Sequence, residues 1–354
     1  MRAFSRPGDR MPVLLIPTLG PLHILHPRYN AVTVLELAKA FRPQALLLAS
    51  YGAEDLEAST WRNHNELSLF QLLPWAEQSG VAVTALDNLS GQRRQAEEFR
   101  EALSLYPRGK EILAGIAVLD QNLRTLLTSP ITPESWSNTG FLQGLKDYLE
   151  GYKKTFGEGP ATGFRQERME SVARRIRETH TSAHPEKAQS NIAVLVDALD
   201  YPYLLGLLPE SQAPAARQPS EEERQRAILD RAWRLQEEDD WAALLSQLQE
   251  VPGPEASYLA SQVYLAAGQV EDAFNLMEAL VHSNFQQPAY LPGYVLSRYG
   301  QLADMQGKRD TALKAYRATL ALSWAPPEAR EAALAGTRSP FGLPGPDKGD
   351  HPAQ

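Results

Sequence analysis

Two histidines stand three residues apart near the start of the chain, and imidazole is the side chain best suited to proton transfer or metal binding near neutral pH. His23 and His26 follow the apolar run at residues 13–16. His23 could act as a general base or as a metal ligand, and His26 could face the same pocket from a tight turn. The alternative for His23 is a loop histidine that is hydrogen-bonded to a neighbouring carbonyl.

Carboxylates follow two later apolar runs and could join the histidines in one site. Asp87 comes directly after residues 81–86, and Asp200 comes shortly after residues 192–196. Asp200 could bind a divalent metal through its oxygen atoms or could orient His23. As a loop carboxylate it could equally be structural, for example as the cap of the next helix.

An arginine is the remaining candidate. Arg168 lies in a basic amphipathic segment at residues 165–180, together with four other arginines. Its guanidinium could reach the same site and bind an anion as a planar fork. The alternative is a solvated helix face. The candidate catalytic residues are thus His23, Arg168, Asp200 and Asp87, and the candidate metal ligands are His23, His26 and Asp200.

A sheet would have to position these side chains. Four apolar runs are too short for helices and predict buried strands. They alternate with segments of helical period, which indicates an α/β fold with a mostly parallel sheet. Such sheets bind ligands beyond the carboxyl ends of their strands, so the loops that carry the candidates should meet at one rim. The predicted strands are residues 13–16, 45–49, 81–86 and 192–196.

Helices are predicted between the strands and in a long insertion. The apolar stripe at residues 31–41 follows Asn30, a residue suited to capping a helix, and residues 66–78 form the next helix. Residues from about 92 to 160 have helical character only, which predicts a helical insertion over the sheet. The first domain is therefore expected at residues 1–208, with the first ten residues as a loose tail.

Beyond this domain, residues 209–220 have the composition of an interdomain linker, and only helices are predicted after them. A turn residue followed five positions later by alanine, with glycine as the turn residue in two of three cases, recurs at spacings of 30 and 39 residues, on either side of the tetratricopeptide period of about 34. Residues 221–336 therefore resemble tetratricopeptide (TPR) repeats, with three helical hairpins and a capping helix, and residues 337–354 resemble a disordered tail. The recurring pairs are Gly268 and Ala273, Gly307 and Ala312, and Glu238 and Ala243.

The repeat-like domain has the composition of a binding surface. Residues 221–336 hold 10 Lys/Arg and 17 Asp/Glu, a net charge of -7 out of -8 for the whole chain. We expect a protein or peptide partner here, and the acidic excess favours a basic one. Six tyrosines could line a concave peptide groove, although the commoner place for such aromatics is the core of the repeats. They are Tyr258, Tyr264, Tyr290, Tyr294, Tyr299 and Tyr316.

Composition argues against several classes of protein. The chain has no cysteine, which excludes disulfides, zinc–thiolate sites and thiol nucleophiles. A net charge of -8 argues against general nucleic-acid binding, which normally needs a basic face. No apolar run approaches the roughly 20 residues that span a bilayer. We therefore expect a cytoplasmic protein without nucleic-acid or membrane partners. Glycine-rich phosphate loops, nucleophile elbows and His-Glu-x-x-His helices are also missing.

Three segments of the first domain together resemble one known superfamily. They are Gly-x-x-His at residues 20–23, Arg-Gln-Glu-Arg-Met-Glu-Ser-Val-Ala-Arg-Arg-Ile at residues 165–176, and the late strand with its short helix at residues 192–208. In this order they are similar to the Tiki/TraB, haem-binding ChaN-like and erythromycin-esterase-like superfamily. The resemblance implies an α/β domain whose active or metal site includes His23 and Arg168.

Two positions depart from the pattern of that superfamily. Asp200 stands where a second histidine is expected, and the acids after the second strand are delayed to Glu54 and Asp55. The leading hypothesis is therefore a partner-binding protein, with a TPR-like interaction domain and a degenerate pocket for a small ligand at the sheet rim. The alternative is a metal-dependent or His-based hydrolase of an ester or peptide bond, with a divalent metal as its cofactor in the first case.

Overall fold

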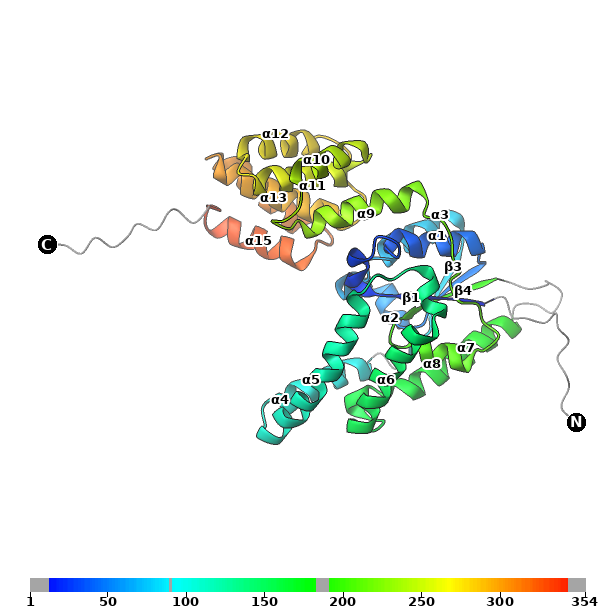
Figure 1. Cartoon of the computed structure of the whole chain (residues 1–354). Coiled ribbons are helices and arrows are strands. Elements are labelled where there is room, and N and C mark those ends of the chain that lie inside the picture. Colours follow the sequence, from blue (N-terminus) through cyan, green and yellow to red (C-terminus); the bar gives the residue numbers. More distant parts are fainter. Residues whose placement is uncertain (1–12, 89–90, 183–190, 343–354) are drawn as a thin grey trace, which may run out of the picture. The chain divides into compact units, whose positions relative to one another are not determined.

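The computed structural model of the chain describes residues 13–88, 91–182 and 191–342 and divides into two units, Met1–Ala227 and Ile228–Gln354. The first unit carries four strands and the helices around them, and helices continue through the second (Figure 1). This is the order of an α/β region and a helical region that the sequence predicts. The tails predicted at both ends fall largely outside the described residues.

A four-stranded sheet forms the centre of the first unit. β1 (Val13–Thr18) pairs with β4 (Ile192–Asp197), β4 pairs with β2 (Ala45–Leu48), and β2 pairs with β3 (Ala82–Ala85). Every pair is parallel, which confirms the predicted parallel sheet. Because the last strand of the sequence lies between the first and the second, the loop that follows β4 is at the middle of the carboxyl-end rim.

Helices lie on both faces of the sheet. α1 (Ala31–Phe41) and α3 (Leu69–Ser79) lie on one face, and α7 (Arg165–Ser182) and α8 (Tyr201–Leu207) lie on the other (Figure 1). β1, β2 and β4 are almost entirely buried, as expected for apolar strands covered on two faces. The third predicted strand differs, since β3 is at the edge of the sheet and half of its residues are exposed.

The predicted helical insertion is present between β3 and β4. It consists of α4 (Gly91–Ser104), α5 (Pro107–Thr128) and α6 (Thr139–Phe156), and α5 packs against the other two. Prolines start two of its segments, α5 and the 3-10 turn η3 (Pro133–Ser137), because a residue without an N–H is well tolerated in a first helical turn. A second short 3-10 turn, η4 (Pro160–Thr162), leads into α7.

The cap predicted at the start of α1 is confirmed. The side-chain oxygen of Asn30 accepts hydrogen bonds from the N–H groups of Val32 (3.1 Å) and Thr33 (3.0 Å), and its Nδ2 donates to the carbonyl of Glu223 (3.0 Å). We expect Asn30→Ala to lower the free energy of unfolding by about 1–3 kcal/mol, because it removes the cap and the donor to a buried carbonyl. Chemical denaturation would measure the loss. Asn138→Ala, at the exposed cap of α6, is the matched control, and equal losses would contradict the extra role of Asn30.

The segment predicted as an interdomain linker belongs in part to the sheet. Gln212 donates its backbone N–H to the carbonyl of Val13 (2.8 Å), and its carbonyl accepts from the N–H of Leu15 (3.0 Å). These bonds form an isolated bridge on the outer side of β1. The segment therefore covers an edge that would otherwise expose unpaired backbone groups.

The boundary between the units falls later than predicted. It lies inside α9 (Glu221–Arg234), between residues 227 and 228, rather than at residue 221. The first turn of α9 is fixed by the carboxylate of Glu223, which accepts from the N–H of Ser220 at 2.7 Å and from Arg217 at 2.6 Å. These bonds, together with the bond from Asn30, explain why the start of this helix belongs to the first unit.

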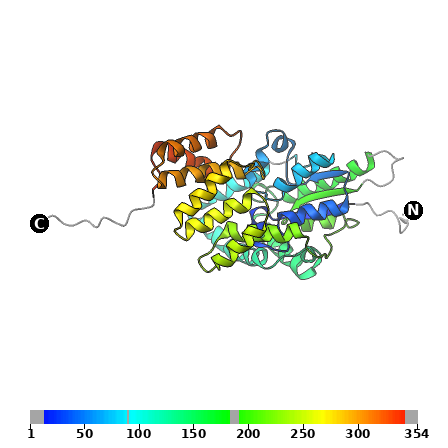
Figure 2. The same ribbon diagram turned by 90° about the horizontal axis from the view of Figure 1, so that it is seen from above.

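The second unit continues through six more helices in the described residues. Consecutive helices from α10 to α15 pack on each other, and Figure 2 shows those coloured from yellow to red side by side. Within the described part of the chain, no helix is long and apolar enough to cross a membrane. The helices are α10 (Trp241–Glu250), α11 (Pro254–Ala266), α12 (Val270–Val281), α13 (Leu291–Met305), α14 (Arg309–Ala321) and α15 (Pro327–Arg338).

Two of the recurring pairs found in the sequence have the same place in this unit. Gly268 (φ 76°) and Gly307 (φ 71°) adopt the left-handed conformation in the turns before α12 and α14. Ala273 and Ala312 are each the fourth residue of the helix that follows, and both are fully buried. Small residues at these positions let the paired helices approach closely.

The third recurring pair, Glu238 and Ala243, differs from the other two by one residue. Ala243 is exposed, and Leu244, the fourth residue of α10, is buried instead.

The six tyrosines of this unit belong to its core or pack against it, which is the alternative to a peptide groove. Tyr258 and Tyr316 are core residues, and the partly buried ones that pack against the core are Tyr264, Tyr290, Tyr294 and Tyr299. The last helix, α15, extends to Arg338, past the predicted start of the tail.

Candidate functional site

A cavity of about 690 Å³ lies at the carboxyl-end rim of the sheet, where the sequence predicts a ligand site. Thr18 ends β1, Ser50 follows β2 and Asp197 ends β4, and all three line this rim cavity. Five carboxylates and two basic side chains line it, so its wall is predominantly acidic. The charged and ionisable lining residues are Glu54, Asp55, Glu66, Glu97, Asp197, His64 and Arg94.

His23 is fully buried beside the rim cavity, and backbone groups occupy both of its ring nitrogens. Nε2 accepts a hydrogen bond from the N–H of Leu19 (3.0 Å), and Nδ1 lies 2.9 Å from the carbonyl oxygen of Tyr29. A carbonyl can only accept, so the proton is on Nδ1 and the ring is neutral. Burial lowers the pKa of His23, against the opposing effects of the Glu66 carboxylate and the Tyr29 carbonyl. His23 therefore has the structural role that the sequence left open as the alternative.

His26 also binds backbone groups, but on a different element. Its Nε2 lies 2.9 Å from the carbonyl oxygen of Leu127, and its Nδ1 accepts from the N–H of Ile131 at 3.4 Å. Both partners are at the end of α5 or just beyond it. His26 thus joins the loop after β1, which forms the 3-10 turn η1 (Gly20–Leu25), to the helical insertion.

The predicted metal ligands do not form a metal site. Among residues 13–88, 91–182 and 191–342, no group of three or more His, Asp or Glu side chains could hold a metal ion. The structure thus departs from the prediction of a metal at His23, His26 and Asp200. The reason is physical, since both imidazoles direct their nitrogens to backbone groups and Asp200 is engaged by an arginine.

Arg168 and Asp87 meet as the rim topology predicts. The Nη2 of Arg168 donates to Oδ2 of Asp87 at 2.7 Å, and the two side chains are only 2% and 1% exposed. Asp87 follows β3 and Arg168 comes from the first turns of α7, so this pair fastens the helix to the sheet. The Nε of Arg168 is buried and has no hydrogen-bond partner.

Asp200 pairs with Arg165, another arginine of α7. The Nη1 of Arg165 lies 2.5 Å from Oδ1 of Asp200, which is fully buried. Asp200 occupies the cap position of α8, but its side chain makes no capping hydrogen bond. The predicted alternative of a helix cap is therefore wrong, because the carboxylate turns to α7 instead.

Part of the basic face of α7 is a contact surface, although Arg174 and Arg177 are exposed. Arg175 donates to the carbonyls of Leu86 and of Ala85, the latter at 3.3 Å, and Arg177 donates to the carbonyl of Leu207 at 2.5 Å. Together with Arg165 and Arg168, these side chains hold α7 against the ends of β3, β4 and α8. Two of the arginines that suggested a solvated face, Arg165 and Arg175, thus help to fix the rim.

Glu66 is a buried acid of the rim cavity that the sequence analysis missed. Its carboxylate accepts from the N–H of Gly20 (2.9 Å) and from both the N–H (3.1 Å) and the hydroxyl (2.6 Å) of Ser68, and it lies 3.5 Å from Nε2 of His23. The turn around it explains why α3 begins at Leu69 instead of residue 66. No local pattern marks this glutamate as part of the rim, since its partner Gly20 comes from a loop 46 residues away.

His64 and Asp55 form a second histidine–carboxylate contact, also unpredicted. Nε2 of His64 lies 3.7 Å from Oδ1 of Asp55, and both residues line the rim cavity. The His64 side chain is 56% exposed, in contrast to His23. It is the last residue of the 3-10 turn η2 (Thr60–His64), shortly after the delayed acids that follow β2. This is an imidazole that a ligand could reach.

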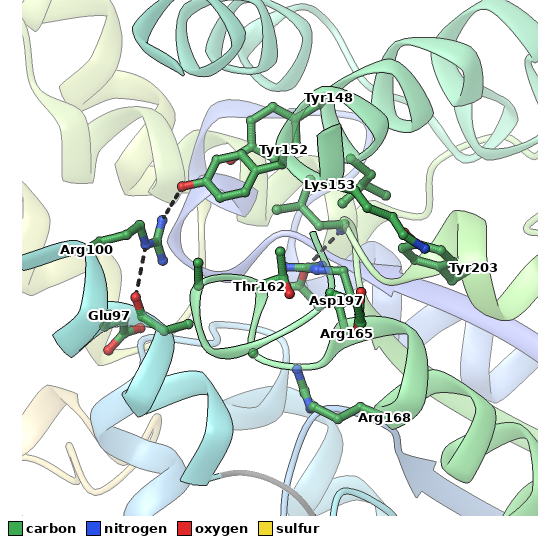
Figure 3. Close-up of a pocket in the computed structure, with 16 residues that line it drawn as sticks. Glu97, Arg100, Tyr148, Tyr152, Lys153, Thr162, Arg165, Arg168, Asp197 and Tyr203 are labelled. Atoms are coloured by element: carbon green, nitrogen blue, oxygen red, sulfur yellow. Dashed lines mark hydrogen bonds between the residues drawn. The ribbon is translucent and has the colours of Figure 1, made fainter. Parts of the chain in front are cut away.

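A second cavity, of about 240 Å³, lies between the insertion and α7 (Figure 3). It shares Glu97, Asp197 and Leu199 with the rim cavity, so the two adjoin. We call it the basic pocket, because four cationic side chains line it against three carboxylates, and three tyrosines complete its wall. The cations are Arg100, Lys153, Arg165 and Arg168, the acids are Glu97, Glu158 and Asp197, and the tyrosines are Tyr148, Tyr152 and Tyr203.

Comparison of the chain with models of known protein families, with curated proteins and with solved structures finds no significant match. The resemblance to the Tiki/TraB and ChaN-like superfamily stays a prediction.

The arrangement at the rim can bind a ligand with opposite charges at its two ends. The rim cavity favours hydrogen-bond donors or a cationic group, because carboxylates outnumber bases there. The basic pocket favours an acceptor or an anion. Asp197 lies between the two, and its carboxylate accepts from the N–H of Leu199 at 2.9 Å.

Proposed function

We propose that the chain is a partner-binding protein. Its helical unit holds a protein or peptide partner, and its α/β unit binds a small ligand at the rim of the sheet. The observation that carries the proposal is the state of His23. The histidine best placed in the sequence to support hydrolysis is buried and neutral, and it uses both ring nitrogens for backbone groups, beside a cavity in whose lining carboxylates outnumber basic side chains.

Repeated turn geometry supports a TPR-like helical unit. The N–H of Gln269 donates to the carbonyl of Tyr264 at 2.9 Å, and the N–H of Lys308 donates to the carbonyl of Ala303 at 2.8 Å. Each bond closes the same six-residue turn around a left-handed glycine. Paired helices that repeat in this way present a continuous surface, which is the usual basis of partner binding by such proteins. The acidic excess of residues 221–336 favours a basic partner segment.

We expect capture of this partner to require residues 228–354. The full chain and a chain ending at Ala227, which keeps the whole first unit, would be immobilised and exposed to the same cell lysate, and bound proteins would be identified by mass spectrometry. A partner specific to the full chain should be released as salt is raised, because its contacts are electrostatic. The proposal fails if the shortened chain captures the same proteins.

A second function is favoured by the contact of His64 with Asp55. An exposed imidazole close to a carboxylate can act as a general base, and this one lines the rim cavity. The chain would then be a His-based hydrolase of an ester or peptide bond, with His64 in the role that the sequence assigns to His23. Water or a hydroxyl group of the substrate would have to be activated next to this ring.

An esterase and peptidase screen on the full chain separates the two functions. The informative variant is His64→Gln, because an exposed side chain can be changed without loss of the fold. Asn63→Gln, beside it in the same turn, is the control. Turnover that His64→Gln abolishes and Asn63→Gln retains would establish the hydrolase and end the binding-only proposal. A lack of turnover in the wild-type chain would support binding.

A further inference from the structure

The basic pocket has a donor that lacks an acceptor. Arg168 lines the pocket and is 2% exposed, and while its Nη2 binds Asp87, its buried Nε has no hydrogen-bond partner. Figure 3 shows its guanidinium pointing from α7 toward the pocket. A buried N–H of a charged group without an acceptor is unfavourable, because water no longer solvates it. An acceptor bound in the pocket would complete its hydrogen bonding.

Two further cations of the pocket lack an acidic partner in the described part of the chain. Arg100 donates to the hydroxyl of Tyr152 (3.3 Å) and to the carbonyl of Ala96 (3.4 Å), and Lys153 donates to the side-chain oxygen of Gln166 (2.7 Å). All of these acceptors are neutral. The positive charge of both side chains is therefore available to an anion.

The acids of the pocket are mostly engaged with backbone donors. Asp197 accepts from the N–H of Leu199, and Glu158 accepts from the N–H of Gln166 at 2.9 Å. Arg165 and Arg168 are paired with carboxylates that lie outside the lining, those of Asp200 and Asp87. Arg100 and Lys153 thus remain without an acidic partner in the described residues, and Arg168 keeps its unpaired Nε donor.

Aromatic side chains give the pocket an apolar wall. Tyr152 is largely buried, and its ring lies 6.0 Å from the guanidinium carbon of Arg100. Burial raises the pKa of Tyr203, so its hydroxyl keeps its proton and can donate to an anion. A volume of about 240 Å³ leaves room for one small ring beside an anionic group.

We propose that the basic pocket binds a small phosphate monoester, with the phosphate on Arg168, Arg100 and Lys153 and the organic part against Tyr152 and Tyr203. Phosphate is favoured over a single carboxylate because three cationic donors from separate elements, α7, α4 and α6, line the same small pocket. This inference deepens the proposed function and rests on it, since it names the chemical class of the ligand that the α/β unit holds.

Calorimetric titration of the full chain with phenyl phosphate tests the proposal. We expect one site, and we expect Arg100→Gln and Lys153→Gln each to weaken binding by about tenfold to a hundredfold, the loss typical of a charged hydrogen bond. Lys154→Gln is the matched control, because it changes the next, exposed residue of α6 outside the lining. Arg94→Gln, which lines only the rim cavity, should also bind normally.

Other probes decide the class of ligand. Benzoate should bind much more weakly than phenyl phosphate, and inorganic phosphate should compete with it. Equal binding of benzoate, or binding that the two pocket variants leave unchanged, would overturn the assignment. So would the absence of binding at millimolar phenyl phosphate.

A direct readout keeps the test independent of partner binding. The Nε–H resonance of Arg168, assigned through Arg168→Lys, should shift when phenyl phosphate is added and should shift less in Lys153→Gln at the same concentration. An unshifted resonance in the wild-type chain would overturn the proposal. If the phosphate ester fails to bind but capture still requires residues 228–354, the ligand class alone is wrong. If capture fails as well, the proposed function is wrong.

Discussion

Asp87→Asn should lower the free energy of unfolding of the α/β unit by about 3–5 kcal/mol. The guanidinium of Arg168 keeps its charge, because arginine is not deprotonated in proteins. With its carboxylate partner removed, that charge would remain 2% exposed, with only a neutral amide at the former 2.7 Å contact. The penalty is therefore the cost of an uncompensated buried charge, which is larger than the net gain from the pair itself.

Urea denaturation of the full chain, followed by circular dichroism, measures the loss. The double variant Asp87→Leu with Arg168→Met should recover most of it, because replacing a buried pair by apolar side chains is often neutral. Glu98→Gln is the control, since it breaks the solvent-exposed contact of Glu98 with Arg94 (3.7 Å) and should leave the midpoint unchanged. A double variant as unstable as Asp87→Asn would show that packing rather than charge is decisive.

The place of this pair was predictable from the sequence because topology alone determines it. Asp87 directly follows an apolar run, and parallel strands bring their carboxyl ends to one rim. Arg168 lies on a helix whose apolar residues must face the sheet. It comes directly before one of these residues, Met169, in the first turns of that helix, so it should lie near the rim of the sheet. The Asn30 cap was predictable for a similar reason, since it depends on a single residue and its nearest neighbours.

The state of His23 was not predictable, because it depends on backbone geometry. The 3-10 turn η1 turns the N–H of Leu19 and the carbonyl of Tyr29 toward one ring. A sequence shows that a histidine follows a strand but not which way the next turn folds. Glu66 illustrates the same limit, since it contacts Gly20 and His23 of this loop although it lies more than 40 residues further along the chain.

The order of the strands was also beyond the sequence, and it determines which side chains share a cavity. β4 lies between β1 and β2, so Asp197 reaches both the rim cavity and the basic pocket. The basic pocket depends further on how the insertion packs, because Arg100 and Lys153 come from two of its helices. Helical periodicity predicts that such helices exist but does not say which of their faces meet.

His23→Ala should be the second strongly destabilising replacement, with a loss of about 2–5 kcal/mol in the free energy of unfolding. It leaves the buried N–H of Leu19 and the carbonyl of Tyr29 without partners and opens a cavity in a fully buried site. His64→Ala is the control, because its side chain is 56% exposed and it lines the rim cavity beside which His23 is buried. Denaturation at pH 7.5 distinguishes them, and a loss as small as that of His64→Ala would contradict a structural role of His23.

The same histidine should make the stability depend on pH in a definite direction. Burial lowers the pKa of His23 below its ordinary value of 6.5, so below pH 6.5 the unfolded chain binds a proton that the folded chain does not. Stability is then complete above about pH 6.5 and falls as the pH is lowered, by up to about 1.4 kcal/mol per pH unit, until the folded-state pKa is reached. His23→Asn cannot titrate, so its denaturation midpoint should change less between pH 7 and pH 5.5 than that of the wild-type chain. Parallel pH profiles for the two proteins would contradict this. They would show that the Glu66 carboxylate, 3.5 Å from Nε2 of His23, cancels the effect of burial on the pKa, so that the buried ring is protonated in the folded chain.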